Sequence, residues 1–213
     1  MTDLVSVASN AVQSYQRALG TVSNNIANVS TDGYSRQDVT LAANQVLLQF
    51  VYLASYAMDG FVFAAESLVG QAMGAKAVAQ LRRGASVTAV WAFGSAIVMA
   101  AGFWIAGPFV IDVMAKDPAV QQAARLYLPH MALAPLLGAL AWMLDGVFIG
   151  ATRTKDMRNM MIVSLGVFML AWWTLEGRYG NHGLWAALNI FFIARGITFA
   201  TRMPSLERRA FGS

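Results

Sequence analysis

Five long apolar segments constrain this chain more than any other feature of its sequence. A helix that crosses a lipid bilayer needs about 20 mainly apolar residues. The segments that approach or exceed this length are residues 46–73, 84–111, 126–150, 160–175 and 184–201. Together they predict an all-α integral membrane bundle of about five transmembrane helices.

The overall composition supports a bilayer as the surrounding solvent. Charged residues make up 12% and hydrophobic residues 57% of the chain, whereas a soluble domain carries about 25% charged residues. The alternative is a soluble protein with five buried helices, but 213 residues leave too little polar surface to cover them.

Several kinds of chemistry are disfavoured. The chain has no Cys and only two His, His130 and His182, so a thiolate metal site is excluded and a His-based one nearly so. No phosphate-binding loop or nucleophile elbow is present. We therefore expect neither an enzyme nor a bound cofactor, and we interpret His182 as a solvated loop residue.

The basic residues of the loops predict the orientation in the membrane. The loops after the first, third and fifth segments carry most of them: Lys76, Arg82, Arg83, Arg153, Lys155, Arg158, Arg202, Arg208 and Arg209. Because Lys and Arg gather in cytoplasmic loops, we expect a cytoplasmic C-terminus and an external N-terminal segment. The same rule accounts for the net charge of +4 without nucleic acid as a partner.

Residues 1–45 differ from the rest of the chain. They are rich in Ser, Asn, Gln, Thr and Asp, and the composition changes abruptly near Gln45. Apolar residues alternate at spacings of four and three from Ala8 to Val29, the pattern of a helix that packs on another helix. Residues 30–33, Ser-Thr-Asp-Gly, are typical of a turn. We predict an N-terminal amphipathic heptad helix and turn over residues 1–45, and a separate membrane part over 46–213.

The N-terminal segment resembles a family of flagellar proteins. Residues 23–34 read Ser-Asn-Asn-Ile-Ala-Asn-Val-Ser-Thr-Asp-Gly-Tyr, followed by Ser-Arg-Gln. This motif resembles the N-terminus of flagellar hook-associated protein 1, the hook–filament junction family. The resemblance implies a helix that packs against flagellar axial helices, and a chimeric chain.

Three motifs of the membrane part resemble a second family. Residues 56–61 read Tyr-Ala-Met-Asp-Gly-Phe, residues 144–153 read Leu-Asp-Gly-Val-Phe-Ile-Gly-Ala-Thr-Arg, and residues 180–185 read Gly-Asn-His-Gly-Leu-Trp. Together they resemble the C-terminal half of the DinF branch of MATE multidrug transporters, over about residues 46–211.

This second resemblance implies a function and a location. Such transporters export small amphiphilic or cationic drug-like compounds from the bacterial inner (cytoplasmic) membrane, coupled to inward H⁺ or Na⁺. They have two six-helix lobes, and the segments here are similar to helices eight to twelve. We therefore expect a partial C-lobe that is inactive without its N-lobe.

Ionisable groups inside a bilayer are costly and often mark a transport pathway. By the resemblance, Asp145 matches an acidic position of the tenth helix that binds the coupling cation. A carboxylate in a low-dielectric cavity can exchange a proton near neutrality. The alternative is a helix-end residue that hydrogen-bonds the nearby backbone.

Asp59 and Glu66 are further candidates for cation coupling or transport. They lie seven residues apart, so two helical turns place them on one face, about 10 Å apart along the axis. Such a face suits the interior of a lobe or the substrate cleft. The alternative, slightly favoured, is structural ion pairing with Arg195.

Three functions for the whole chain follow. The first is a fragment of a cation-coupled exporter, and the second is a structural segment of the flagellar junction. The third is a fusion of both without a cellular function. The division at Gln45/Val46, which interrupts both resemblances, favours the third for the chain as a whole.

Overall fold

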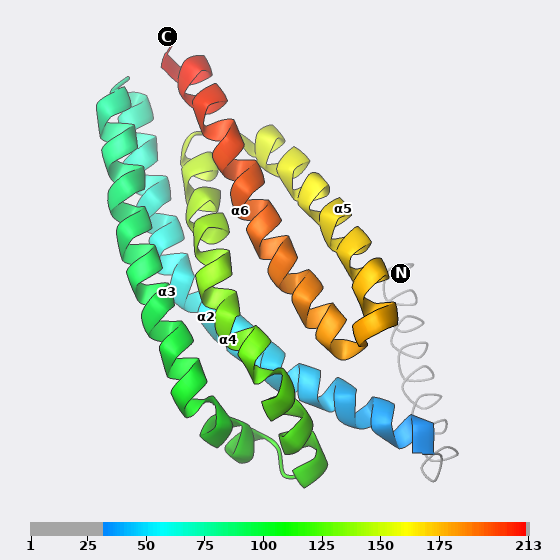
Figure 1. Cartoon of the computed structure of the whole chain (residues 1–213). Coiled ribbons are helices and arrows are strands. Elements are labelled where there is room, and N and C mark those ends of the chain that lie inside the picture. Colours follow the sequence, from blue (N-terminus) through cyan, green and yellow to red (C-terminus); the bar gives the residue numbers. More distant parts are fainter. Residues whose placement is uncertain (1–31, 212–213) are drawn as a thin grey trace, which may run out of the picture. The chain divides into compact units, whose positions relative to one another are not determined.

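The computed structural model describes residues 32–211, which form long α-helices joined by short loops (Figure 1). The helices are α2 (Asp32–Gly74), α3 (Val78–Met114), α4 (Pro118–Gly150), α5 (Thr154–Tyr179) and α6 (Asn181–Phe211). Within the described part of the chain, five helices are long and apolar enough to cross a membrane, which confirms the predicted all-α fold. The helices extend beyond the predicted spans because backbone hydrogen bonding continues into polar flanks that hydropathy does not mark.

The chain divides into two compact units between Ala42 and Ala43, and α2 runs through this point. The heptad pattern of residues 8–29 lies outside the described residues. Asp32 and Gly33 begin α2, so these two residues are not in the predicted turn. Acidic residue types are favourable in the first turn of a helix, so Asp32 is compatible with a helix start. The division at Gln45/Val46 stays a prediction.

In the second unit, residues 43–213, α4 is the central helix. Of the most apolar 18-residue stretch of α4, 72% of the residues are buried, against 11% in the corresponding stretches of α3 and α5. Both α3 and α6 pack against α4, and α5 packs against α6. The outer helices leave large apolar side chains exposed, among them Trp91, Ile105 and Phe109 on α3 and Leu170 and Trp173 on α5. Such surfaces suit contact with lipid tails.

Two glycines on α4 let the backbone of α2 come very close. A Cβ atom at Gly146 would lie 2.1 Å from the carbonyl oxygen of Val62, and one at Gly150 would lie 2.4 Å from that of Glu66. The two glycines are four residues apart and share a face of the helix, the small-residue spacing that allows close packing of membrane helices. The α2–α4 contact therefore requires glycine at both positions.

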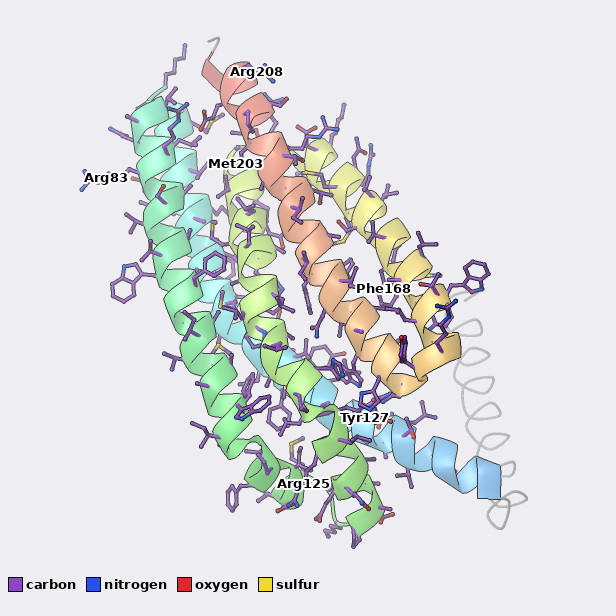
Figure 2. All side chains as sticks on the ribbon, viewed as in Figure 1. Arg83, Arg125, Tyr127, Phe168, Met203 and Arg208 are labelled. Carbon is purple, nitrogen blue, oxygen red and sulfur yellow. The ribbon has the colours of Figure 1, made fainter. Side chains whose placement is uncertain are left out.

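The charged side chains gather unequally at the two ends of this unit. Figure 2 shows Arg83 and Arg208 at one end and Arg125 at the other. At the Arg83 end, Arg82 Nη2 lies 2.7 Å from Glu207 Oε2 and joins the start of α3 to the end of α6. Most of the loop Lys and Arg residues belong to helix ends on this side, so the fold places the basic groups together.

We expect Gly146→Ala to lower the midpoint of thermal unfolding of the detergent-solubilised chain. Its methyl group would meet the backbone oxygen of Val62, which cannot turn aside as a side chain can, and overpacking of this kind costs about 1–3 kcal/mol. The matched control is Gly166→Ala on α5, where a Cβ atom meets nothing within 4 Å and the helix gains about 0.5–1 kcal/mol. Equal midpoints for the two variants would contradict the close α2–α4 contact.

Candidate functional site

The interior of the bundle contains one ion pair between α4 and α6 in the described part of the chain. Arg195 Nη2 donates a hydrogen bond to Asp145 Oδ2 at 2.5 Å. Each side chain is only 11% exposed. A carboxylate and a guanidinium therefore neutralise each other inside a membrane-length helix bundle.

Aromatic pairs flank this ion pair on both sides. Trp142 packs on Phe192 with ring centroids 5.2 Å apart, and Phe148 packs on Phe199 at 5.0 Å. Trp142, Asp145 and Phe148 follow one another at helical spacing along α4, as their partners do along α6. The Arg195 guanidinium carbon also lies 5.9 Å from the centroid of the Phe199 ring, within range of a cation–π attraction. The ion pair thus lies between two aromatic layers.

The direction of each side chain follows from the helix. Successive residues of an α-helix are turned by about 100°, so Asp145 and Gly146 face different neighbours. Gly146 faces α2, and Asp145 faces α6, where Arg195 meets it. The central position of α4 is what allows one short stretch of sequence to serve both contacts.

The ion pair is only partly satisfied. Asp145 Oδ1 and Arg195 Nε are buried without a hydrogen-bond partner. Buried polar groups are nearly always paired, so each exception calls for an explanation. The second carboxylate oxygen of Asp145 is therefore an acceptor that no protein group uses.

The expected pairing of Arg195 with Asp59 or Glu66 is wrong. Among the described residues, neither carboxylate takes part in an ion pair, and Arg195 binds Asp145 instead. Asp145 on the central helix α4 faces α6 and is therefore the carboxylate that meets Arg195. Asp145 correspondingly bonds Arg195 rather than the nearby backbone. Asp59 and Glu66 are both half-buried on α2, and the backbone of Glu66 touches Gly150.

A second set of polar contacts joins distant segments and was missed by sequence reasoning. The Asn44 and Asn181 side-chain amides exchange two hydrogen bonds of 2.7 and 2.9 Å. Trp185 Nε1 also donates to Asn44 Oδ1 at 2.9 Å. The prediction that His182 lies in a loop is wrong as well, because it belongs to the first turn of α6, and its half-buried ring lies against His130. Separations of 52 to 141 residues leave no local sequence signal for these contacts.

The fold and the buried pair define the class of protein: an integral membrane protein with several spans and charged groups in its interior. The sequence matches the MatE family over residues 15–173. The chain belongs to this family, whose members are transporters and not enzymes.

Curated relatives agree with this assignment. The chain is 36% identical over 166 residues to DNA damage-inducible protein F of Escherichia coli (strain K12), covering 75% of this chain and 35% of that protein. It is 27% identical over 165 residues to Protein DETOXIFICATION 43 of Arabidopsis thaliana, covering 78% and 31%. Protein DETOXIFICATION 42 of the same plant is 29% identical over 160 residues, covering 73% and 30%.

The chain spans about a third of the length of these relatives. No solved structure gives a significant match. The family match begins at residue 15, inside the segment predicted to be flagellar. None of the comparisons supports that flagellar resemblance, and it stays a prediction.

We expect Asp145→Asn and Arg195→Gln each to destabilise the bundle, by about 3–5 kcal/mol for an uncompensated buried charge. Asp145→Asn is the costlier change, because a guanidinium cannot lose its proton in a protein whereas a lone carboxylate can gain one. Denaturant unfolding in detergent measures the free energy of unfolding of both variants. The double variant should lose less than the sum of the two single variants.

The two single variants and the double variant form a double-mutant cycle. Glu66→Gln is its control, because Glu66 is half-buried and forms no ion pair within residues 38–208. Strict additivity of Asp145→Asn and Arg195→Gln would show that the two side chains do not interact.

Proposed function

We propose that residues 43–211 form part of a cation-coupled exporter of small amphiphilic or cationic compounds. Membership of the MatE family supports a transporter. The observation that carries the coupling role is the buried Asp145–Arg195 pair, in which one carboxylate oxygen has no partner. In this proposal Asp145 binds the coupling ion, H⁺ or Na⁺.

The geometry supports a mechanism of coupling for this proposal. In the described arrangement Arg195 neutralises Asp145. An ion that binds the carboxylate competes with Arg195 for one negative charge, so its arrival weakens the bond between α4 and α6. A ligand shifts a conformational equilibrium only by its different affinity for the two states. Here the competition between the ion and Arg195 supplies that difference.

Asp59 and Glu66 are secondary candidates for the cation path. Both are half-buried on α2, and neither is in an ion pair among the described side chains. A carboxylate inside a membrane helix usually faces protein or water and marks a functional route. In the proposed transporter the substrate cleft lies between this bundle and a second helical lobe, which is the partner it requires.

We further propose a bacterial inner-membrane location with a cytoplasmic C-terminus and an external N-terminal segment. The support is the clustering of basic side chains at the end of the bundle that carries Arg83 and Arg208 (Figure 2), because Lys and Arg favour the cytoplasmic side. No observation favours a flagellar role for residues 1–45.

Transport is tested by placing residues 46–211 in the matching part of the E. coli relative. We expect cells with this chimera to export the fluorescent cation ethidium in an H⁺- or Na⁺-dependent manner. Asp145→Asn should reduce the export rate at least about tenfold, a loss of about 1.4 kcal/mol of transition-state stabilisation or more. Glu176→Gln, which alters an exposed carboxylate on α5, should leave the rate unchanged. Full export by the Asp145→Asn chimera, at equal membrane levels, would overturn the coupling role.

The full chain by itself should not lower ethidium accumulation below that of an empty-vector strain, because the proposed cleft requires a second lobe. Fluorescence of washed cells gives the comparison. Export by the chain alone would show that copies of this bundle form a complete pathway.

The orientation has a direct test because the chain contains no Cys. Two single-cysteine variants are compared. Lys116→Cys introduces a thiol between α3 and α4, and Lys155→Cys introduces one near the start of α5. A membrane-impermeant maleimide should label the Lys116→Cys thiol in intact spheroplasts and the Lys155→Cys thiol only after permeabilisation. The opposite labelling pattern would place the C-terminus outside.

A further inference from the structure

The only two histidines of the sequence meet in the folded chain. His130 Nε2 and His182 Nδ1 lie 3.1 Å apart, although 52 residues separate them along the chain. His130 belongs to α4 and His182 to the first turn of α6. Both side chains are half-buried.

Neighbouring groups contact the pair from α4 and α6. The His182 ring packs edge-on against Tyr127, with centroids 4.7 Å apart, and Figure 2 shows Tyr127 on α4 near the start of α6. The backbone carbonyl of His130 accepts a hydrogen bond of 3.0 Å from Asn189 Nδ2. The His182 ring is thus packed on one side by Tyr127, and the backbone at His130 is tied to α6, while both rings remain able to turn.

We propose that His130 and His182 bind a divalent transition-metal ion of the Zn²⁺ type. Imidazole nitrogen is a preferred ligand of Zn²⁺, Cu²⁺ and Ni²⁺. Two nitrogens on one tetrahedral Zn²⁺ ion, each about 2.0–2.1 Å from the metal, are separated by about 3.3 Å. The observed 3.1 Å is close to that value, so metal binding needs a turn of each ring toward a shared point and almost no change of backbone.

The site uses two protein ligands. Among the described residues, no group of three or more His, Cys, Asp or Glu is placed to hold a metal, so water completes the coordination. A structural zinc site has four protein ligands and a catalytic one has three with an open position, so two ligands hold the ion less tightly than either. The pair therefore forms an exchangeable site that ties α4 to α6 at the end where α6 begins.

The test uses the full, tag-free chain in detergent, stripped with EDTA and titrated with Zn²⁺ in a calorimeter. We expect one Zn²⁺ per chain and a rise in the thermal unfolding midpoint, since a ligand that binds only the folded state stabilises it. His130→Gln or His182→Gln should weaken binding at least about tenfold, because even outer-shell changes at metal sites cost 10–100-fold. Tyr127→Phe keeps both imidazoles and should retain the affinity.

The unfolding midpoints of the metal-free variants show whether each still folds. If the Gln variants do not fold, the double variant His130→Cys/His182→Cys offers two thiolate ligands at the same positions and should bind Zn²⁺ or close a disulfide on oxidation. Absence of Zn²⁺ binding by the unaltered chain, or equal binding by the folded Gln variants, would overturn the proposal.

Discussion

The described bundle depends on how closely its neighbours can approach α4. Between membrane helices there is little hydrophobic driving force, so packing and polar contacts decide the association. Gly146 and Gly150 bring the backbone of α2 to within contact distance, while the adjacent face of α4 meets α6 through Asp145 and two aromatic pairs. One helix therefore positions both the scaffold and the candidate site.

The Asp145–Arg195 pair is costly to keep in this position. A buried ion pair is often no more stable than apolar side chains of similar volume, and ionisable groups at bilayer depth are usually functional. Here the pair lies between aromatic layers and leaves one carboxylate oxygen free. A buried ion pair with an oxygen that has no partner is the observation on which the proposed coupling role rests.

Sequence reasoning anticipated much of the fold and part of the site. Apolar segments of membrane length predicted all five helices in the described residues, because a bilayer imposes both length and composition. Asp145 was singled out because it lies within an apolar segment and matches an acidic position of the resembled family, and the structure places it against Arg195; its coupling role stays a prediction. The partner of Arg195 was assigned to the wrong helix, because helical periodicity shows which residues share a face and not which helix lies opposite. The pairing of His130 with His182 had no sequence signal at all.

The sequence by itself determined that the chain enters a membrane as long helices, where its apolar spans begin and end, and which loops are basic. These properties depend on each segment's own composition and on the bilayer. Only the tertiary structure decided that α4 is central, that Asp145 meets Arg195 and that the two histidines touch. Those contacts join residues about 50 positions apart, and they depend on which helices pack together, which the composition of each segment does not specify.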